Sequence, residues 1–139
     1  MIISRIDKTE YEELMLGSAQ KFKPSFMQMP FWGDFKIKSS NYVVENFKAT
    51  DGELVVGAFQ TLVRNYLGFF KVGYISRGRI LFDPNMIGLL HEALEFELKN
   101  LGYSAVLWEY DLDFDESEPE LEKTGFQIEL ELQPSQTII

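Results

Sequence analysis

One segment, DPNMIGLLHEALEFELKNLG at residues 83–102, constrains the fold more strongly than any other. Asp83 is suited to cap a helix, Pro84 fits its first helical position, and Gly102 is suited to follow its last. Apolar side chains recur at spacings of three and four residues and form a single stripe: Ile87, Leu90, Leu94, Leu98 and Leu101. The segment therefore predicts a helix over residues 84–100 whose apolar stripe packs into a core.

Segments typical of strands lie on both sides of this helix. Strands are expected at residues 1–6, 42–49, 53–64, 69–75, 103–110 and 126–132, and further helices at 7–19, 26–39 and 118–126. Along the chain the order is β α α β β β α β α β. This order predicts one α/β (α+β) domain, residues 1–139, with a mixed, mainly antiparallel sheet flanked by helices.

Local signals define several of these elements. Asp7 is suited to cap the first helix, and Glu10 would complete a capping box. The Asp-Gly pair within residues 50–52 predicts a hairpin turn, and residues 65–68 predict the next one. Side chains alternate in the strand that follows, with Lys71 on one face and the others opposite: Phe70, Val72 and Tyr74.

The charge balance and the cysteine and histidine content exclude several classes of protein. Lys and Arg number 13 against 22 Asp and Glu, a net charge of −9 that disfavours tight general binding to nucleic acid. With no Cys and one His, a disulfide framework and a thiolate or multi-histidine metal site are excluded. We expect no cofactor and no metal, although a carboxylate-only magnesium or calcium site stays open. The chain shows neither a signal peptide nor the ~20 apolar residues of a membrane span, so a cytoplasmic protein is expected.

The aromatic segment SFMQMPFWGDFK, residues 25–36, is the first candidate for function. Trp32 and Lys36 are four residues apart and share one face of the expected helix, so the Lys36 stem can lie along the Trp32 ring. Taken alone, the pair favours a core role, because aromatic side chains on helices are mostly buried. The alternative is an anchor that holds a basic side chain at a binding cleft.

The segment SRGRILFDP, residues 76–84, is the second candidate, because it joins a strand end to a helix start. Free backbone N–H groups at such a position favour anions, and Gly78, between Arg77 and Arg79, permits close backbone approach. Two solvated arginines that balance an acidic chain are an equally good interpretation. His91, at the edge of the apolar stripe, has no evident nucleophile or carboxylate partner and is not expected to be catalytic.

Five segments together resemble the Fem family of peptidoglycan-bridge aminoacyltransferases. SFMQMPFWGDFK is similar to the family's FLQSPFWGEFK, and GYISRGRIL to its YIPRGPVL, with both prolines replaced and one basic group gained. LLHEALEFELKNLGYSAVLWEYD is similar to the helix and strand that follow in the family. LEKTGFQ and LQPSQTII resemble its LEKLGF and IQPKDTIVLDL. Order and spacing agree for all five segments, which cover nearly the whole chain.

The resemblance implies an acetyltransferase-like (GNAT-like) fold and the first of two such domains, the one associated with a lipid- or nucleotide-linked muropeptide precursor. Members of the family transfer an amino acid from aminoacyl-tRNA to the precursor peptide. Because aminoacyl-tRNA is associated with the second domain, we expect this chain alone not to catalyse transfer. Lys36 matches a lysine that the family uses near the precursor's phosphates. The expected substrate-binding residues are Trp32, Lys36, Tyr74, Arg77, Gly78 and Arg79, and the expected helix anchors are Met29, Phe31, Trp32 and Phe35.

Two other functions stay open. One is a non-catalytic binding module for a phosphorylated or muropeptide ligand. The other is a small-molecule N-acyltransferase that uses acyl-CoA, which needs a Q/RxxGxG/A loop before a helix; SRGRIL is the nearest approach and lacks that spacing. No residue is identifiable as a general base, and catalysis would rest on positioning and on electrostatic help for the developing oxyanion.

Overall fold

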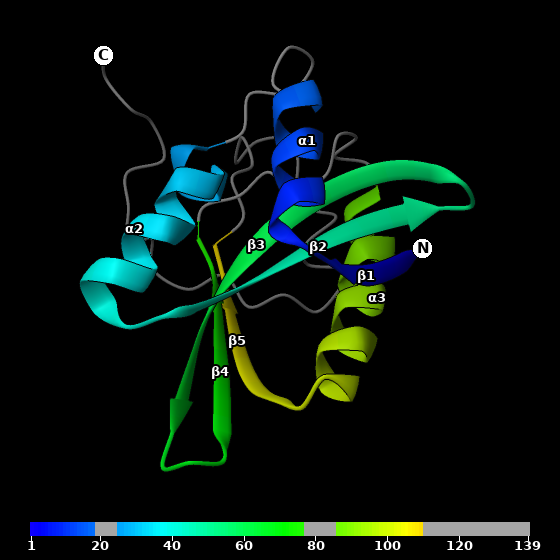
Figure 1. The fold of residues 1–139 in the computed structure, drawn as a ribbon. Coiled ribbons are helices and arrows are strands. Elements are labelled where there is room, and N and C mark those ends of the chain that lie inside the picture. Colours follow the sequence, from blue (N-terminus) through cyan, green and yellow to red (C-terminus); the bar gives the residue numbers. More distant parts are fainter. Residues whose placement is uncertain (19–24, 77–85, 110–139) are drawn as a thin grey trace.

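The described residues of the chain, in a computed structural model, are 1–18, 25–76 and 86–109. They form a five-stranded sheet in the order β1-β2-β3-β4-β5, with helices on both faces (Figure 1). The strands are β1 (Ile2–Ile6), β2 (Val43–Asp51), β3 (Leu54–Tyr66), β4 (Phe70–Ile75) and β5 (Tyr103–Trp108). The helices are α1 (Lys8–Ser18), the short 3₁₀ helix η1 (Phe26–Gln28), α2 (Pro30–Ser40) and α3 (Ile87–Asn100). The helix and strand expected at 118–126 and 126–132 lie outside the described residues.

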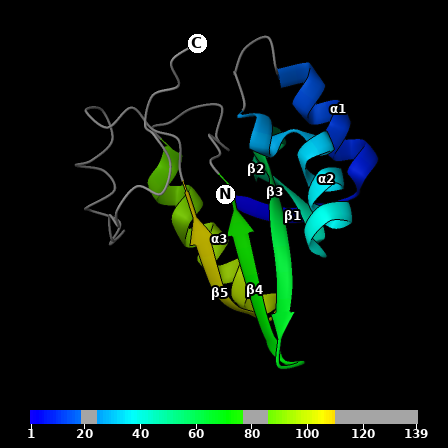
Figure 2. The same ribbon diagram turned by 90° about the vertical axis from the view of Figure 1, so that its left-hand side faces the viewer.

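The sheet is mixed and mainly antiparallel, which confirms the predicted fold class. Strands β1 to β4 pair with their neighbours in antiparallel fashion, and β5 runs parallel to β4. A parallel pair requires a crossover, and α3 lies in the segment that joins β4 to β5. The helices α1 and α2 lie on one face of the sheet, and α3 lies on the other (Figure 2).

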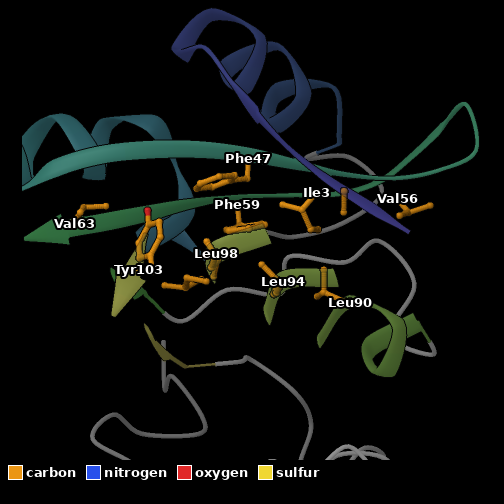
Figure 3. Close-up of a cluster of buried hydrophobic side chains, with 11 residues drawn as sticks. Ile3, Phe47, Val56, Phe59, Val63, Leu90, Leu94, Leu98 and Tyr103 are labelled. Carbon is orange, nitrogen blue, oxygen red and sulfur yellow. The ribbon is translucent and has the colours of Figure 1, made fainter. Parts of the chain in front are cut away.

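The main hydrophobic core lies between the sheet and α3 (Figure 3). On α3 the predicted stripe is confirmed, because Leu90, Leu94 and Leu98 are buried and Leu101 packs against the same cluster. The side chain of Ile87, and the expected cap residues Asp83 and Pro84, lie outside the described part. The sheet contributes the rest of the cluster: Ile3, Phe47, Ala49, Val56, Phe59, Val63, Ile75 and Tyr103.

The cap of the first helix is where the sequence places it. The Asp7 carboxylate accepts a hydrogen bond from the Glu10 backbone N–H at 2.8 Å, as a helix N-cap does. The Glu10 carboxylate itself accepts a hydrogen bond from the Lys48 ammonium, 2.5 Å away on β2. Glu10 therefore fastens α1 to the sheet, and the described hydrogen bonds do not include the return bond of a capping box.

The predicted helix over residues 26–39 is wrong at its start, because the chain forms two helices there. Met29 separates η1 from α2 in an extended conformation, with φ −75° and ψ 146°, and Pro30 is the first residue of α2. Proline disfavours the helical conformation in the residue before it and lacks the N–H that an interior helical position needs. Pro30 therefore begins α2 and prevents η1 from continuing into it.

Both predicted hairpin turns are shifted toward the C-terminus. Asp51 still pairs with Leu54, so the first loop is residues 52–53, and Gly52 supplies the positive φ of 60°. In the second hairpin, β3 continues to Tyr66, and the chain turns at Leu67 and Gly68 with φ values of 54° and 78°. Two positive φ values in succession are those of a type I′ turn, whose twist matches that of the strands.

A buried carboxylate joins four strands on the α3 face of the sheet. Glu45 of β2 accepts a hydrogen bond from the Tyr103 hydroxyl, and both its oxygens lie 3.0 Å from the Lys71 ammonium. Arg5 lies 3.4 Å from the same carboxylate. Gly73 makes room, since a Cβ there would come within 2.6 Å of the Tyr103 ring. Lys71 therefore lies on the opposite face of β4 from Tyr74, as the alternation of side chains in the sequence predicts.

Burial raises the pKa of Glu45, but the Tyr103 hydroxyl, Lys71 and Arg5 outweigh it and hold the pKa below its ordinary value. Burial also raises the pKa of the Tyr103 hydroxyl, and the Glu45 carboxylate beside it raises it further. Both shifts keep the pair as a carboxylate that accepts from a neutral hydroxyl. The stability that Glu45 contributes is therefore present above the pKa of an unfolded Glu, about 4.3, and is lost as the pH falls through the lower folded value.

We predict that Leu94→Ala lowers the free energy of unfolding by about 2–5 kcal/mol, because the side chain is 3% exposed and its removal leaves a cavity. The matched control is Leu89→Ala on the same helix, where the side chain is 54% exposed and the expected change is below about 0.5 kcal/mol. Urea denaturation of both variants measures the difference. Equal losses would remove Leu94 from the core.

We predict that Glu45→Gln destabilises the protein by about 3 kcal/mol at neutral pH, because it leaves Lys71 partly buried without its counter-charge. The difference from the parent should shrink as the pH is lowered below about 4, where the parent carboxylate is itself protonated. Chemical denaturation at several pH values measures this. Glu95→Gln, which removes an exposed carboxylate of α3, should have a small effect by comparison. A constant difference between pH 7 and pH 3 would contradict the assigned cause.

Candidate functional site

The helix α2 approaches the sheet closely because one of its residues is glycine. A Cβ on Gly33 would lie 2.6 Å from the Gln60 side-chain oxygen and 3.2 Å from a methyl carbon of Val44. The next residue, Asp34, accepts hydrogen bonds from the Lys8 ammonium at 2.8 and 2.9 Å and so joins α2 to α1. Gly33 and Asp34 thus fix where α2 lies, and Trp32 and Lys36 are positioned with it.

Two buried glutamines join η1 and α2 to the middle of the sheet. If the β3–β4 register continued beyond Leu62 and Tyr74, Gln60 would face Ser76. The Gln28 amide lies between them instead. Its oxygen accepts from the Gln60 N–H at 2.9 Å, and its nitrogen donates to the Ser76 carbonyl at 2.5 Å. The Gln28 side chain therefore replaces a strand-to-strand bond at the point where β4 ends.

The second glutamine completes this network. The Gln60 side-chain nitrogen donates to the carbonyl oxygens of Met27 and Met29, at 3.0 and 2.9 Å, on either side of Gln28. From α1, the Tyr11 hydroxyl donates to the Gln28 carbonyl at 2.6 Å, and burial raises the pKa of that hydroxyl. Buried amides are costly unless hydrogen-bonded, and these are well supplied with partners. The network fixes η1, the start of α2 and the end of β4 relative to one another.

The aromatic side chains of the 25–36 segment are more exposed than the sequence predicts. Phe31 and Phe35 are 57% and 53% exposed, so the expectation that they anchor the helix is wrong. Met29 does pack partly against the smaller core cluster under α1. Trp32 is half-buried and contacts the rings of Phe26 and Phe35, with centroids 5.4 and 5.5 Å away. The close approach at Gly33 allows the large rings beside it to remain at the surface.

The Lys36 ammonium lies over aromatic rings, as the spacing from Trp32 predicts. Its Nζ is 5.0 Å from the centroid of the Trp32 ring and 5.9 Å from that of Tyr42, which precedes β2. Arg64 of β3 stacks on the same tyrosine, with Cζ 4.0 Å from the ring centroid. We call Trp32, Lys36, Tyr42 and Arg64 the cation–aromatic cluster. Sequence analysis did not identify Tyr42 or Arg64, because strand register rather than sequence spacing brings them to Lys36.

Most basic side chains in the described ranges pair with a carboxylate. The pairs are Arg5–Glu45, Lys8–Asp34, Lys48–Glu10, Lys71–Glu45 and Lys99–Glu95. Lys36, Lys38 and Arg64 have no carboxylate within salt-bridge distance among the residues described. Lys38 lies in the last turn of α2, where a cation favours the helix dipole. In a chain of net charge −9, the two cations of the cluster thus lack an acidic partner within the part of the chain that the structure describes.

The other predicted site residues lie at or beyond the end of β4. Tyr74 shares a sheet face with Arg64, and its hydroxyl donates to the Glu109 carboxylate at 2.7 Å. Arg77, Gly78 and Arg79 lie outside the described residues. Ser76, the residue before them, is buried and held by Gln28. The structure therefore brings Trp32 and Lys36 together, and Gln28 links the end of β4 to the segment that carries both.

Solved structures with this arrangement of strands and helices include acetyltransferases and a Fem protein. FemX matches 91% of this chain with a TM-score of 0.67 and 18% identity. A probable acetyltransferase matches all of it with a TM-score of 0.57 and 12% identity. The aminoglycoside 6'-N-acetyltransferase AAC(6')-IG from Acinetobacter haemolyticus also matches all of it, with a TM-score of 0.51 and 14% identity. These similarities confirm the predicted GNAT-like fold and its resemblance to a Fem structure.

The likeness is one of fold. No family model matches the chain, and no curated protein is similar enough in sequence to match it. The chain spans about a third of the FemX chain, because the match covers 32% of that structure. In contrast, the match covers almost the full length of the two acetyltransferases, 98% of one chain and 99% of the other. In the described ranges, no helix has the length and apolar character needed to cross a membrane.

We predict that Gly33→Ala destabilises the protein by about 1–3 kcal/mol, because the new methyl group overpacks the contact between α2 and the sheet. Gln60 cannot move aside without losing its bonds to Met27 and Met29. Gly17→Ala on α1 is the matched control. A Cβ there meets nothing within 4 Å, so the better helix propensity of Ala should leave stability equal or slightly higher. Thermal denaturation that ranks both variants alike would contradict the close approach.

Proposed function

We propose that this chain is the precursor-side domain of a Fem-type aminoacyltransferase and binds a peptidoglycan precursor through its pyrophosphate. The observation that carries the proposal is the Lys36 ammonium, which lies 5.0 Å from the Trp32 ring centre with no carboxylate partner in the described part of the chain. A phosphate oxygen would supply that partner, because charge-assisted hydrogen bonds are the strong ones. The fold likeness to FemX and the SFMQMPFWGDFK segment support the same assignment.

Arg77, Gly78 and Arg79 are proposed to complete the rim of this site, with Tyr74 at its edge. The support for this part is the position of Ser76. It is fixed by the Gln28 amide, and Gln28 belongs to the segment that continues into Trp32 and Lys36. The chain leaves β4 at that point and continues toward α3 through Arg77. Loops between a strand end and a helix start favour anions.

In this proposal the precursor's peptide amine attacks the carbonyl carbon of the aminoacyl ester. A nitrogen–carbon bond forms, the ester carbon–oxygen bond breaks, and the ribose hydroxyl of the tRNA leaves with the proton that the amine gives up. The contribution of this chain is to hold the precursor so that the amine is correctly placed. The aminoacyl-tRNA is proposed to bind a second domain, and the reaction is proposed to take place in the cytoplasm. A second domain agrees with the length of FemX, whose chain is about three times as long as the part that matches.

A small-molecule N-acyltransferase is the second candidate. It is supported by the acetyltransferase structures, which this fold matches over 98% and 99% of their own length. One of the matching structures, AAC(6')-Iy, contains a bisubstrate analogue built on CoA, so the fold is compatible with that cofactor in a similar protein. The two candidates differ in ligand, because the first requires a muropeptide diphosphate and the second requires acyl-CoA. Calorimetry with a nucleotide-linked muropeptide and, separately, with acetyl-CoA discriminates between them.

We predict that Lys36→Ala weakens binding of a nucleotide-linked muropeptide by roughly 1.5–3 kcal/mol, because a charge-assisted hydrogen bond to phosphate is lost. Arg77→Ala should weaken it similarly. The loss should be smaller at high salt, since screening weakens exposed charge contacts. Stability should change by less than about 1 kcal/mol for Lys36→Ala, because the side chain is half-buried and has no ion pair to lose within the described residues.

The matched control is Lys38→Ala, which removes the same charge from the same helix outside the cluster. Isothermal titration calorimetry on the parent, Lys36→Ala, Arg77→Ala and Lys38→Ala gives the comparison. Only Lys38→Ala should bind like the parent. Equal affinities for all four proteins would refute the site, and tight binding of acetyl-CoA with none of the muropeptide would favour the second candidate.

A further inference from the structure

We infer that Arg64 is a second anion-binding residue, which with Lys36 makes the cation–aromatic cluster a site for a diphosphate group rather than a single phosphate. The inference rests on the proposed function for its biological ligand. Its own basis is the placement of two cations from different elements beside one aromatic ring, Tyr42. Lys36 comes from α2 and Arg64 from β3, so the tertiary fold is required to bring them together.

The two charges act on the same region of space. Since the ring centre of Tyr42 is 5.9 Å from Lys36 Nζ and 4.0 Å from Arg64 Cζ, the charges lie within about 10 Å of each other, comparable to the Debye length at physiological salt. Like charges at that separation repel. Cation–π attraction to the neighbouring aromatic rings offsets part of this repulsion. The described residues provide no carboxylate that would neutralise either Lys36 or Arg64. An anion that bridges them would remove the repulsion.

Arg64 is held ready for such a ligand. Its Nη2 donates to the Ser40 carbonyl at the end of α2, at 2.5 Å, while its guanidinium plane stacks on Tyr42. These two contacts fix the side chain, which is half-buried, and use one of its five N–H donors. The planar fork of an arginine suits phosphate oxygens and loses less freedom on binding when it is already stacked. The remaining donors are therefore held beside the ring that Lys36 also approaches.

Two cations on one ring suit a ligand with two linked anionic groups. A single phosphate needs contact with only one of them, whereas a diphosphate presents a phosphoryl group to each. The class of ligand is thus an organic or inorganic diphosphate. The competing role for Arg64 is purely structural, as a donor to the last turn of α2. The two roles differ in what they affect, because a structural role changes thermal stability and a binding role changes the ratio of diphosphate to phosphate affinity.

The test is calorimetric titration of the intact chain with inorganic pyrophosphate and with inorganic phosphate, for the parent and three variants. We expect the parent to bind pyrophosphate more tightly than phosphate. Arg64→Gln should lose about tenfold in pyrophosphate affinity and much less in phosphate affinity. Arg64→Lys, which keeps the charge without the planar fork, should lie between the parent and Arg64→Gln. Lys38→Gln, which removes a charge of the same helix outside the cluster, should match the parent.

Melting temperatures recorded for the same proteins separate binding from folding. Arg64→Gln with a lowered melting temperature and an unchanged pyrophosphate-to-phosphate ratio would show the structural role and overturn the inference. A parent protein that binds neither anion at millimolar concentration would overturn it as well. Failure of the muropeptide to bind, with the Arg64-dependent pyrophosphate preference intact, would instead count against the proposed function and leave the diphosphate site standing.

Discussion

The buried pair of Gln28 and Gln60 is the constraint on which the rest of the candidate site depends. Between them these amides satisfy a backbone N–H of β3, the last carbonyl before the Arg77 segment, and two carbonyls of the η1–α2 junction. Because an unsatisfied amide in this position would be costly, the three elements can be displaced only together. The spacing between α2 and the sheet, and so the place of Lys36, follows from this hydrogen-bond network together with the close approach at Gly33, and not from the packing of large rings.

The cation–aromatic cluster and the Glu45 cluster show two ways of handling charge in an acidic protein. On the α3 face, Glu45 is matched by Arg5 and Lys71, so that nothing is left for an outside partner. On the α2 face, Lys36 and Arg64 contact aromatic rings, and the described residues give neither of them a counter-ion. The first arrangement closes a core, and the second leaves two half-buried positive charges without a described carboxylate in a protein of net charge −9. This asymmetry distinguishes the two faces of an otherwise continuous sheet.

The order of secondary structure as far as β5 was predictable from the sequence because it is encoded locally. The stripe of α3, the Asp7 cap and the glycine of each turn depend on residues a few positions apart. The start of α2 was misplaced by four residues, since Met29 adopts the conformation that Pro30 demands. Phe31 and Phe35 were expected to anchor α2, because large aromatic residues usually are buried, but Gly33 makes the contact. The spacing of Trp32 and Lys36 on one helix predicted their contact, whereas Gln28, Gln60, Tyr42 and Arg64 meet only through tertiary structure.

The parallel pairing of β4 with β5 has a consequence for the order in which the chain can fold. The strands β2, β3 and β4 are joined by tight turns at Gly52 and at Leu67–Gly68, so their contacts are local and form with little loss of chain entropy. The pairing of β5 requires the chain to cross over through the segment that contains α3, which closes a much longer loop. Until then β4 is an open edge. The meander, with Gln60 at its centre, can thus serve as the early template, and the two edges that β1 and β5 later cover stay open to other chains until those strands pair.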